Sequence, residues 1–207
     1  MSKAIERRSE KRGGEEKRRA ILRAAVKVFA ERGYHGCRIA DVAREAGVAY
    51  GLVYHYFENK EALLTSVFEE SWTLFGEVVA TVAESDAPLG EKVRQIVSVA
   101  LDAYRAHPHA TQVMVLEIAR SPFFLEERRL AQFEDTFRRT AAMIEVAQAR
   151  GEARRDVDPM HGAYVIFGTI EMLLTGFVLH TLDAGDEGAF DAAKEDAIRI
   201  IVRGLAP

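Results

Sequence analysis

The stretch GYHGCRIADVAREAGVAYGLVYHYFENKEALL, residues 33–64, contains two short helical patterns separated by a turn. Gly47 lies between them, and glycine permits a sharp turn because it adopts positive φ without a steric penalty. The second pattern, residues 50–57, places Val53 and Phe57 on one side. Together the two segments predict a helix-turn-helix. The apolar positions of the first segment repeat at helical spacing, at Ile39, Val42, Ala43 and Ala46.

The second helix of a helix-turn-helix enters the major groove of DNA, and the residues here suit that role. Gly51 lets the backbone approach closely, and Leu52 can pack on a thymine methyl group. Tyrosine, histidine and lysine side chains can donate to phosphate oxygens. A competing interpretation makes Tyr54 and Tyr56 core aromatics and Lys60 a solvated cation. The predicted DNA contacts are Arg38, Tyr50, Gly51, Leu52, Tyr54, His55, Tyr56 and Lys60.

Charge is divided unevenly along the 207 residues, whose net charge is −4. Residues 1–60 hold 14 Lys+Arg against 8 Asp+Glu, whereas residues 61–207 hold 14 against 24. A basic head on an acidic body suggests that one part meets a polyanion and the other does not, but charge alone equally allows a solvated basic tail without a partner. We therefore expect three parts: a mobile basic arm over residues 1–14, a DNA-binding domain over 15–60, and a ligand-binding and dimerisation domain over 61–207.

Helical periodicity continues through the rest of the chain, and the sequence predicts an all-α fold of nine helices. With 48% hydrophobic and 29% charged residues, the composition excludes a mostly disordered protein. The single cysteine, Cys37, excludes a disulfide framework and suits the cytoplasm. Residues 163–182 are apolar on most sides, but Glu171 lies in their middle and a central carboxylate is costly in a bilayer. We expect a helix with one face on its own core and the other on a partner, not a membrane span.

The stretch from Gly33 to Leu64 resembles the DNA-binding domain of TetR-family transcriptional regulators. Arg38 and Ala49 depart from the family pattern, which generally has a hydroxyl residue at both positions. The resemblance implies nine helices, with helices four to seven around a ligand pocket and the last two forming a four-helix bundle with a second subunit. The pattern of the family is met by Gly47, Val48, Ala49, Gly51, Tyr54, Tyr56, Phe57, Lys60, Glu61 and Leu63.

Aromatic and methionine residues suggest where an apolar ligand would bind, although such stripes are also typical of plain core. The expected pocket residues are Phe68, Trp72, Phe75, Met114, Glu117, Phe133, Phe137, Phe167 and Glu171. The expected dimer interface consists of Ile166, Ile170, Leu174, Phe177, Phe190, Ala197 and Ile201.

Segments 115–121 and 166–171 resemble the branch of the family that represses fatty-acid degradation genes and responds to long-chain acyl-CoA. A CoA head group needs a basic rim, although each arginine is also explained as part of a solvated, salt-bridged face. The candidates for the rim are Arg105, Arg120, Arg128, Arg129, Arg138 and Arg139.

The resulting hypothesis is a cytoplasmic homodimeric repressor, released from a palindromic DNA operator when a hydrophobic effector, possibly a long-chain acyl-CoA, binds. A regulator of efflux or xenobiotic response that binds bulky apolar drugs is the alternative. From other classes, a helical enzyme or an adaptor without DNA binding is also open. The sequence contains no nucleophile elbow, phosphate loop or zinc signature, so we expect no catalytic residue and no cofactor. His107-Pro108-His109 can reach a metal only with His161 or His180, and we expect no metal site.

Overall fold

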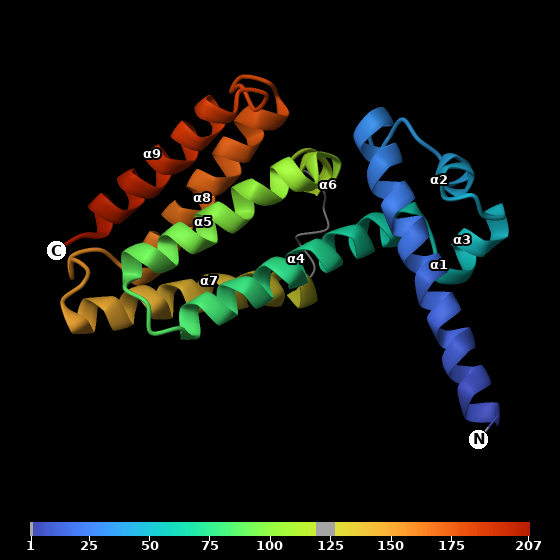
Figure 1. Ribbon diagram of the computed structural model, residues 1–207, viewed down its shortest axis with the longest axis horizontal. Coiled ribbons are helices and arrows are strands. Elements are labelled where there is room, and N and C mark those ends of the chain that lie inside the picture. Colours follow the sequence, from blue (N-terminus) through green and yellow to red (C-terminus); the bar gives the residue numbers. More distant parts are fainter. Residues whose placement is uncertain (1, 119–126) are drawn as a thin grey trace. The chain divides into compact units, whose positions relative to one another are not determined.

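The computed structural model describes residues 2–118 and 127–207, and the side chains of residues 12–116 and 134–207. Within these ranges the chain forms nine α-helices and one π-helical segment, without a β-strand. The all-α prediction is confirmed. The chain divides into two compact units, Met1–Glu70 and Ser71–Pro207 (Figure 1).

The N-terminal unit contains α1 (Ser2–Arg32), α2 (Ile39–Ala46), α3 (Tyr50–Tyr56) and the first turns of α4 (Lys60–Glu84). The unit boundary falls within α4, not at residue 60, because the first turns of α4 supply part of the N-terminal core. That core consists of Ile21, Leu22, Ala25, Val28, Phe29, Ile39, Val42, Ala43, Val53, Phe57, Leu63, Leu64, Val67 and Phe68, all buried.

Residues 2–14, which belong to the expected arm, have a helical backbone that continues into the rest of α1. Glu, Lys and Arg are good helix formers, and each glycine costs a helix only about 1 kcal/mol. Gly13 and Gly14 therefore do not end α1. A Cβ atom on Gly14 would lie 3.6 Å from the Tyr56 hydroxyl, so α1 passes close to the end of α3 at this point.

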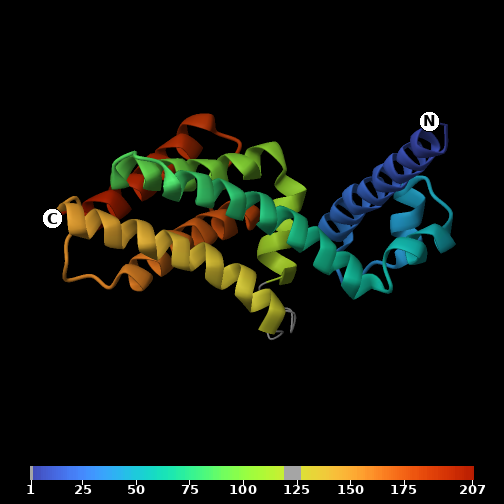
Figure 2. The same ribbon diagram turned by 90° about the horizontal axis from the view of Figure 1, so that it is seen from below.

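The C-terminal unit contains the rest of α4, α5 (Leu89–Ala106), α6 (Pro108–Val113), the π-helical segment η1 (Met114–Ile118), α7 (Glu127–Arg150), α8 (Pro159–Val178) and α9 (Glu187–Leu205). α8 packs against α5, α7 and α9, and Figure 2 shows α7 running beside it. Central core side chains come from five helices: Val79, Val93, Ile96, Val97, Leu101, Ile144, Ile166, Phe177, Phe190 and Ile198.

α8 begins at Pro159, and Asp158 caps its N-terminus. One oxygen of Asp158 accepts from the backbone N–H groups of Met160 (2.8 Å) and His161 (3.1 Å). This side-chain cap satisfies donors that the first turn of a helix otherwise leaves without partners. Asn59 caps α4 in the same way, with its side-chain oxygen 2.7 Å from the Ala62 nitrogen.

α8 is apolar on two opposite faces. By length and composition it is the one helix in the described part of the chain that could cross a membrane, and 33% of its most apolar window is buried. Core helices of soluble proteins pass the same test. The inner face is buried in the core of the C-terminal unit through Ile166, Ile170 and Phe177. The opposite face is exposed, with Val165 at 59% and Met172 at 66%.

The expected dimer interface is therefore assigned to the wrong face. Six of the seven expected residues, Ile166, Ile170, Phe177, Phe190, Ala197 and Ile201, are buried in the core of their own chain, and Leu174 packs against that core. The physical reason is that the most apolar stripe of each late helix covers the local core first. The large apolar side chains left exposed on and just after α8 and on α9 are Tyr164, Val165, Met172, Leu179 and Ile200.

Candidate nucleic-acid interface and effector unit

The turn between α2 and α3 requires glycine. Gly47 ends α2 with a φ of 66°, in the left-handed region that other residues rarely adopt. The Val48 N–H donates to the Ala43 carbonyl at 3.0 Å and closes the end of the helix. Ala49 then begins α3 without a side-chain hydrogen bond, in line with the missing hydroxyl at this position.

α3 presents two tyrosines to solvent. Tyr50 is 53% and Tyr54 44% exposed, so Tyr54 is not a core residue. Their hydroxyl oxygens lie 3.1 Å apart, and the rings meet edge to face with centroids 5.2 Å apart. The hydrogen bond with Tyr50 raises the pKa of Tyr54. The pair presents two hydroxyl groups to solvent.

The other residues predicted from this helix divide by exposure. Gly51 and His55 are exposed, and no atom lies within 4 Å of a Cβ built on Gly51. Leu52 and Tyr56 are half-buried, and Tyr56 lies against α1 near Gly14. Val53 is fully buried, which anchors the opposite side of α3 in the core.

The start of α2 is fixed by Asp41. One carboxylate oxygen of Asp41 accepts from the Arg38 backbone N–H at 2.9 Å, and the other pairs with Arg32 at 2.9 Å and Arg44 at 2.6 Å. The Arg38 hydrogen bond, followed by the charge of Arg32, lowers the pKa of Asp41. A guanidinium has no acceptor, so the Arg38 side chain cannot cap the helix. It remains exposed and faces solvent.

Lys60 is placed differently from its expected role as a phosphate contact. Its ammonium donates to the carbonyl oxygens of Tyr34 (2.6 Å) and Cys37 (3.0 Å), within the loop between α1 and α2. It also lies 4.5 Å from the centroid of the Tyr34 ring. The side chain is half-buried and engaged inside the unit.

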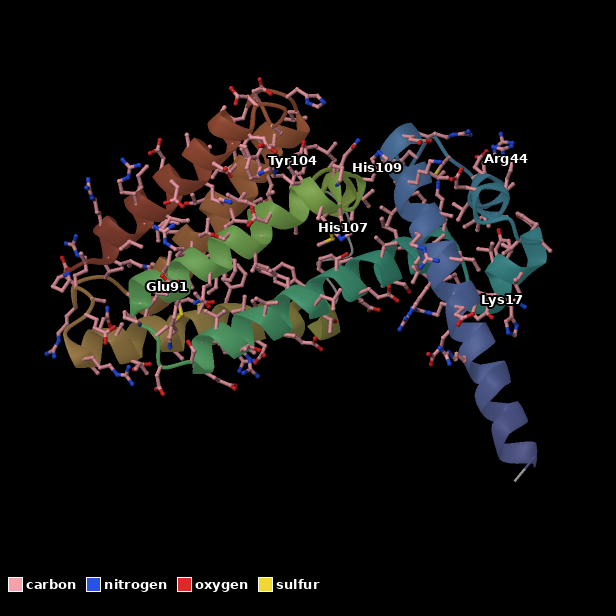
Figure 3. The ribbon with its side chains drawn as sticks, viewed as in Figure 1. Lys17, Arg44, Glu91, Tyr104, His107 and His109 are labelled. Atoms are coloured by element: carbon pink, nitrogen blue, oxygen red, sulfur yellow. The ribbon has the colours of Figure 1, made fainter. Side chains whose placement is uncertain are left out.

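Several exposed cations of the N-terminal unit were not among the predicted contacts. Arg44 lies on α2 and Lys17 on α1, as labelled in Figure 3. Arg19 and Arg23 on α1 are exposed as well. The excess of basic residues in the first 60 positions was the signal for these side chains, but charge counts do not identify individual contacts.

In the C-terminal unit, four of the expected pocket residues form one aromatic cluster. Phe137 and Phe167 have ring centroids 4.5 Å apart, Phe75 lies 6.1 Å from Phe167, and Trp72 lies 5.7 Å from Phe75. Phe167 is buried, and the other three are half-buried. Met114 is half-buried on η1.

Two expected pocket residues are placed elsewhere, and two cannot be described. Phe68 is buried in the N-terminal unit because the first turns of α4 belong to that core. Glu171 is exposed on α8, to one side of the face that carries Ile170 and Phe177. The side chains of Glu117 and Phe133 lie outside the described residues.

A cavity of about 790 Å³ lies at the end of α5, within the size range of small-molecule sites. Its polar groups include Arg105 and His180, and His180 has a φ of 56°, which is unusual for a residue with a side chain. Figure 3 shows Tyr104 at the end of α5, with His107 and His109 just beyond it. The complete lining is Tyr104, Arg105, Pro108, His180, Thr181, Leu182, Asp183, Ala184 and Gly185.

The described arginines of the expected CoA rim are all paired with carboxylates. Arg105 lies 2.7 Å from Glu187, and Arg139 lies 2.7 Å from Asp135. Arg138 is 3.7 Å from the same Asp135. Arg120 lies outside the described residues, as do the side chains of Arg128 and Arg129.

Comparison with known proteins agrees with this geometry. Residues 21–67, which span the helix-turn-helix, match the family model described as bacterial regulatory proteins of the tetR family. The N-terminal unit contains a DNA-binding domain of the TetR-family type. It is similar to the fatty acid metabolism regulator protein of Bacillus subtilis, with 29% identity over 160 residues, 77% of this chain and 82% of that protein. It is also similar to the transcriptional regulator RutR of Escherichia coli, with 25% identity over 92% of this chain and 91% of RutR.

Solved structures extend the similarity of this chain to its C-terminal unit. The regulator FadR of Bacillus subtilis in complex with stearoyl-CoA has a TM-score of 0.78 and 27% identity, over 90% of this chain and 98% of that one. The fatty acid degradation regulator FadR of Bacillus halodurans has a TM-score of 0.80 and 25% identity, over 91% and 96%. These relatives are named as regulators and not as enzymes, and this chain resembles them over both of its units.

Proposed function

We propose that this regulator is a homodimeric repressor that leaves a palindromic DNA operator when a long-chain acyl-CoA binds its C-terminal unit. The operator and the regulator meet in the bacterial cytoplasm. Binding of effector and binding of operator oppose each other, so each lowers the affinity for the other by the same factor.

The observation that carries the DNA half of the proposal is the exposure of α3. Tyr50, Gly51, Tyr54 and His55 are presented to solvent immediately after a turn fixed by Gly47, while Val53 holds the helix to the core. This is the arrangement by which a recognition helix reaches base edges. Arg38 and the exposed cations of α1 supply phosphate contacts that set its register.

Two features of the C-terminal unit support an amphipathic effector. The cluster of Trp72, Phe75, Phe137 and Phe167 suits an acyl chain, because ligand sites are lined mainly by hydrophobic and aromatic side chains. The cavity lined by Arg105, His180 and Asp183 suits a polar head group, to which Arg105 can turn from its partner Glu187. The similarity to the stearoyl-CoA complex of Bacillus subtilis FadR supports acyl-CoA over other amphipathic ligands.

The exposed apolar side chains of the late helices support a second copy of the chain as partner. Val165, Met172 and Leu179 follow each other at intervals of seven residues and lie on one face of α8 and its immediate continuation. Ile200 on α9 is 71% exposed. Apolar side chains of this size are normally covered by a partner, and in a two-fold dimer the same face of each copy meets.

The test uses a duplex selected from a random-sequence library by the wild-type protein. Palmitoyl-CoA should weaken binding to this duplex, whereas free CoA should not. Phe137→Ala should raise the palmitoyl-CoA concentration needed for half-maximal release about tenfold, because the acyl chain loses an aromatic contact. Val146→Ala, an exposed position on the same helix, is the control.

If acyl-CoA esters of all chain lengths leave DNA binding unchanged, the effector is wrong while the DNA-binding proposal stands. A bulky apolar drug that does release the duplex would then favour the alternative regulator of xenobiotic response.

A further inference from the structure

Lys60 connects the start of α4 with a loop more than twenty residues earlier in the chain. Its ammonium donates to the Tyr34 carbonyl at 2.6 Å and to the Cys37 carbonyl at 3.0 Å. A lysine ammonium has three N–H donors, so two of them are used by the main chain of this loop. The same ammonium lies over the Tyr34 ring, a favourable cation–π contact.

The loop that Lys60 holds has no helical hydrogen-bond ladder of its own. It begins at Gly33, which has a φ of 71° and ends α1. It then passes Gly36, where a Cβ atom would come within 2.4 Å of the Arg32 carbonyl oxygen. The Cys37 thiol is buried and donates to the Tyr34 carbonyl at 3.4 Å. The Tyr34 carbonyl thus accepts from both Cys37 and Lys60.

This loop sets where the helix-turn-helix begins. Arg38 follows Cys37 directly and is the residue that precedes the first turn of α2. The carboxylate of Asp41 also fixes the start of α2, because it accepts from the Arg38 N–H and pairs with Arg32. Lys60 in turn follows α3 after three residues, so it links the end of the recognition helix with the beginning of α2.

Resting on the proposed DNA binding, we propose that Lys60 is a positioning residue: it fixes the α1–α2 loop, and through it Arg38 and α2, relative to α3. It does not neutralise a phosphate. Its charge is directed at two carbonyl oxygens and a ring of its own chain. Removing it takes one charged donor from each of the Tyr34 and Cys37 carbonyls and loosens the start of α2.

The salt dependence of DNA binding separates the two roles, because each phosphate contact contributes about 0.9 to the slope of log K against log salt. Wild type, Lys60→Met and Lys60→Gln are compared on the selected duplex between 50 and 300 mM salt. Lys17→Met, which removes an exposed lysine on α1, is the charge-matched control.

The expected result is that Lys60→Met weakens binding tenfold or more while its salt slope equals that of wild type. Lys60→Gln, which keeps an N–H donor without the charge, should recover part of the affinity. A slope lowered by about 0.9 in both variants, with equal losses of affinity, would overturn the proposal and assign Lys60 to a phosphate.

Hydrogen exchange of the free protein tests the same proposal without DNA. The amides of residues 34–38 should exchange faster in Lys60→Met and Lys60→Gln than in wild type. In Lys17→Met their exchange rates should equal those of wild type. Unchanged exchange in both Lys60 variants contradicts the positioning role. If no duplex binds the wild type, the proposed function fails, while the exchange experiment still decides whether Lys60 holds the loop. Should Lys60→Met not fold, Lys60→Gln alone decides the question through its slope and its exchange.

Discussion

The hydroxyl groups of Tyr50 and Tyr54, one helical turn apart on the exposed side of α3, lie 3.1 Å from each other. Each hydroxyl therefore has a partner before DNA arrives. When one tyrosine donates a hydrogen bond to DNA, its side chain is already oriented by the other tyrosine. Less conformational entropy is therefore lost on binding.

Tyr50→Phe should weaken binding to the selected duplex about three- to tenfold, because one hydrogen bond to DNA and the orientation of Tyr54 are lost together. Thermal stability should stay close to wild type, since both side chains are exposed. Tyr164→Phe removes a hydroxyl from a tyrosine that is 61% exposed in the other unit, and should leave DNA affinity unchanged. Equal affinities of wild type and Tyr50→Phe in a fluorescence anisotropy titration would remove Tyr50 from the interface.

Two glycines of the N-terminal unit should respond in opposite ways to alanine. Gly51→Ala has open space around the new Cβ atom and should stabilise the free protein by about 0.5–1 kcal/mol, because alanine favours the helix. The same methyl group would stand between α3 and the DNA, so operator affinity should fall.

Gly36→Ala places a methyl group against the Arg32 carbonyl oxygen and should destabilise the unit by about 1–3 kcal/mol. Urea unfolding measures both stabilities, and a titration with the selected duplex measures affinity. A Gly51→Ala variant that binds DNA like wild type would place α3 farther from the groove than proposed.

Asp41 predicts a dependence of stability on pH. Its pKa is lower in the folded protein than in the unfolded chain, so its stabilising contribution is complete above the unfolded pKa near 4. That contribution is lost as the pH falls through the folded value. Asp41→Asn should therefore unfold at a lower temperature than wild type at pH 7, and the two melting temperatures should converge toward pH 3. A difference that stays constant from pH 7 to pH 3 would mean that the charge of Asp41 is not the cause.

Met172→Glu should convert the proposed dimer into monomers, because it places a charge in the middle of the exposed apolar stripe of α8. Light scattering after size-exclusion chromatography measures the mass. Leu74→Glu is the matched control, since Leu74 on α4 is 65% exposed and lies outside that stripe. A Met172→Glu variant that remains dimeric would place the interface on another face.

The sequence was sufficient for the features that depend on local chemistry. Gly47 marked the turn, and Val53 with Phe57 marked the buried side of α3. Each of these signals acts within one or two helical turns, so neighbouring residues contain the necessary information.

Long-range contacts could not be predicted in the same way. Periodicity showed that α8 has apolar residues on more than one face, but not which face covers the core, so Ile166 and Ile170 were assigned to the partner. The position of Lys60 just after the recognition helix suggested that it contacts a DNA phosphate. The two carbonyl groups that accept its hydrogen bonds lie 23 and 26 residues earlier in the sequence. The spacing of seven between Val165, Met172 and Leu179 was the available signal for the outer face of α8.

Because α8 has one buried and one exposed apolar face, the dependence of the melting temperature on protein concentration distinguishes substitutions on the two faces. In the proposed dimer, a variant of the inner face, such as Ile170→Ala, melts at a lower temperature but keeps the dependence of melting temperature on protein concentration. An outer-face variant such as Met172→Glu loses that dependence, because association no longer contributes to folding. The face on which a substitution falls is then read from how its melting temperature responds to concentration.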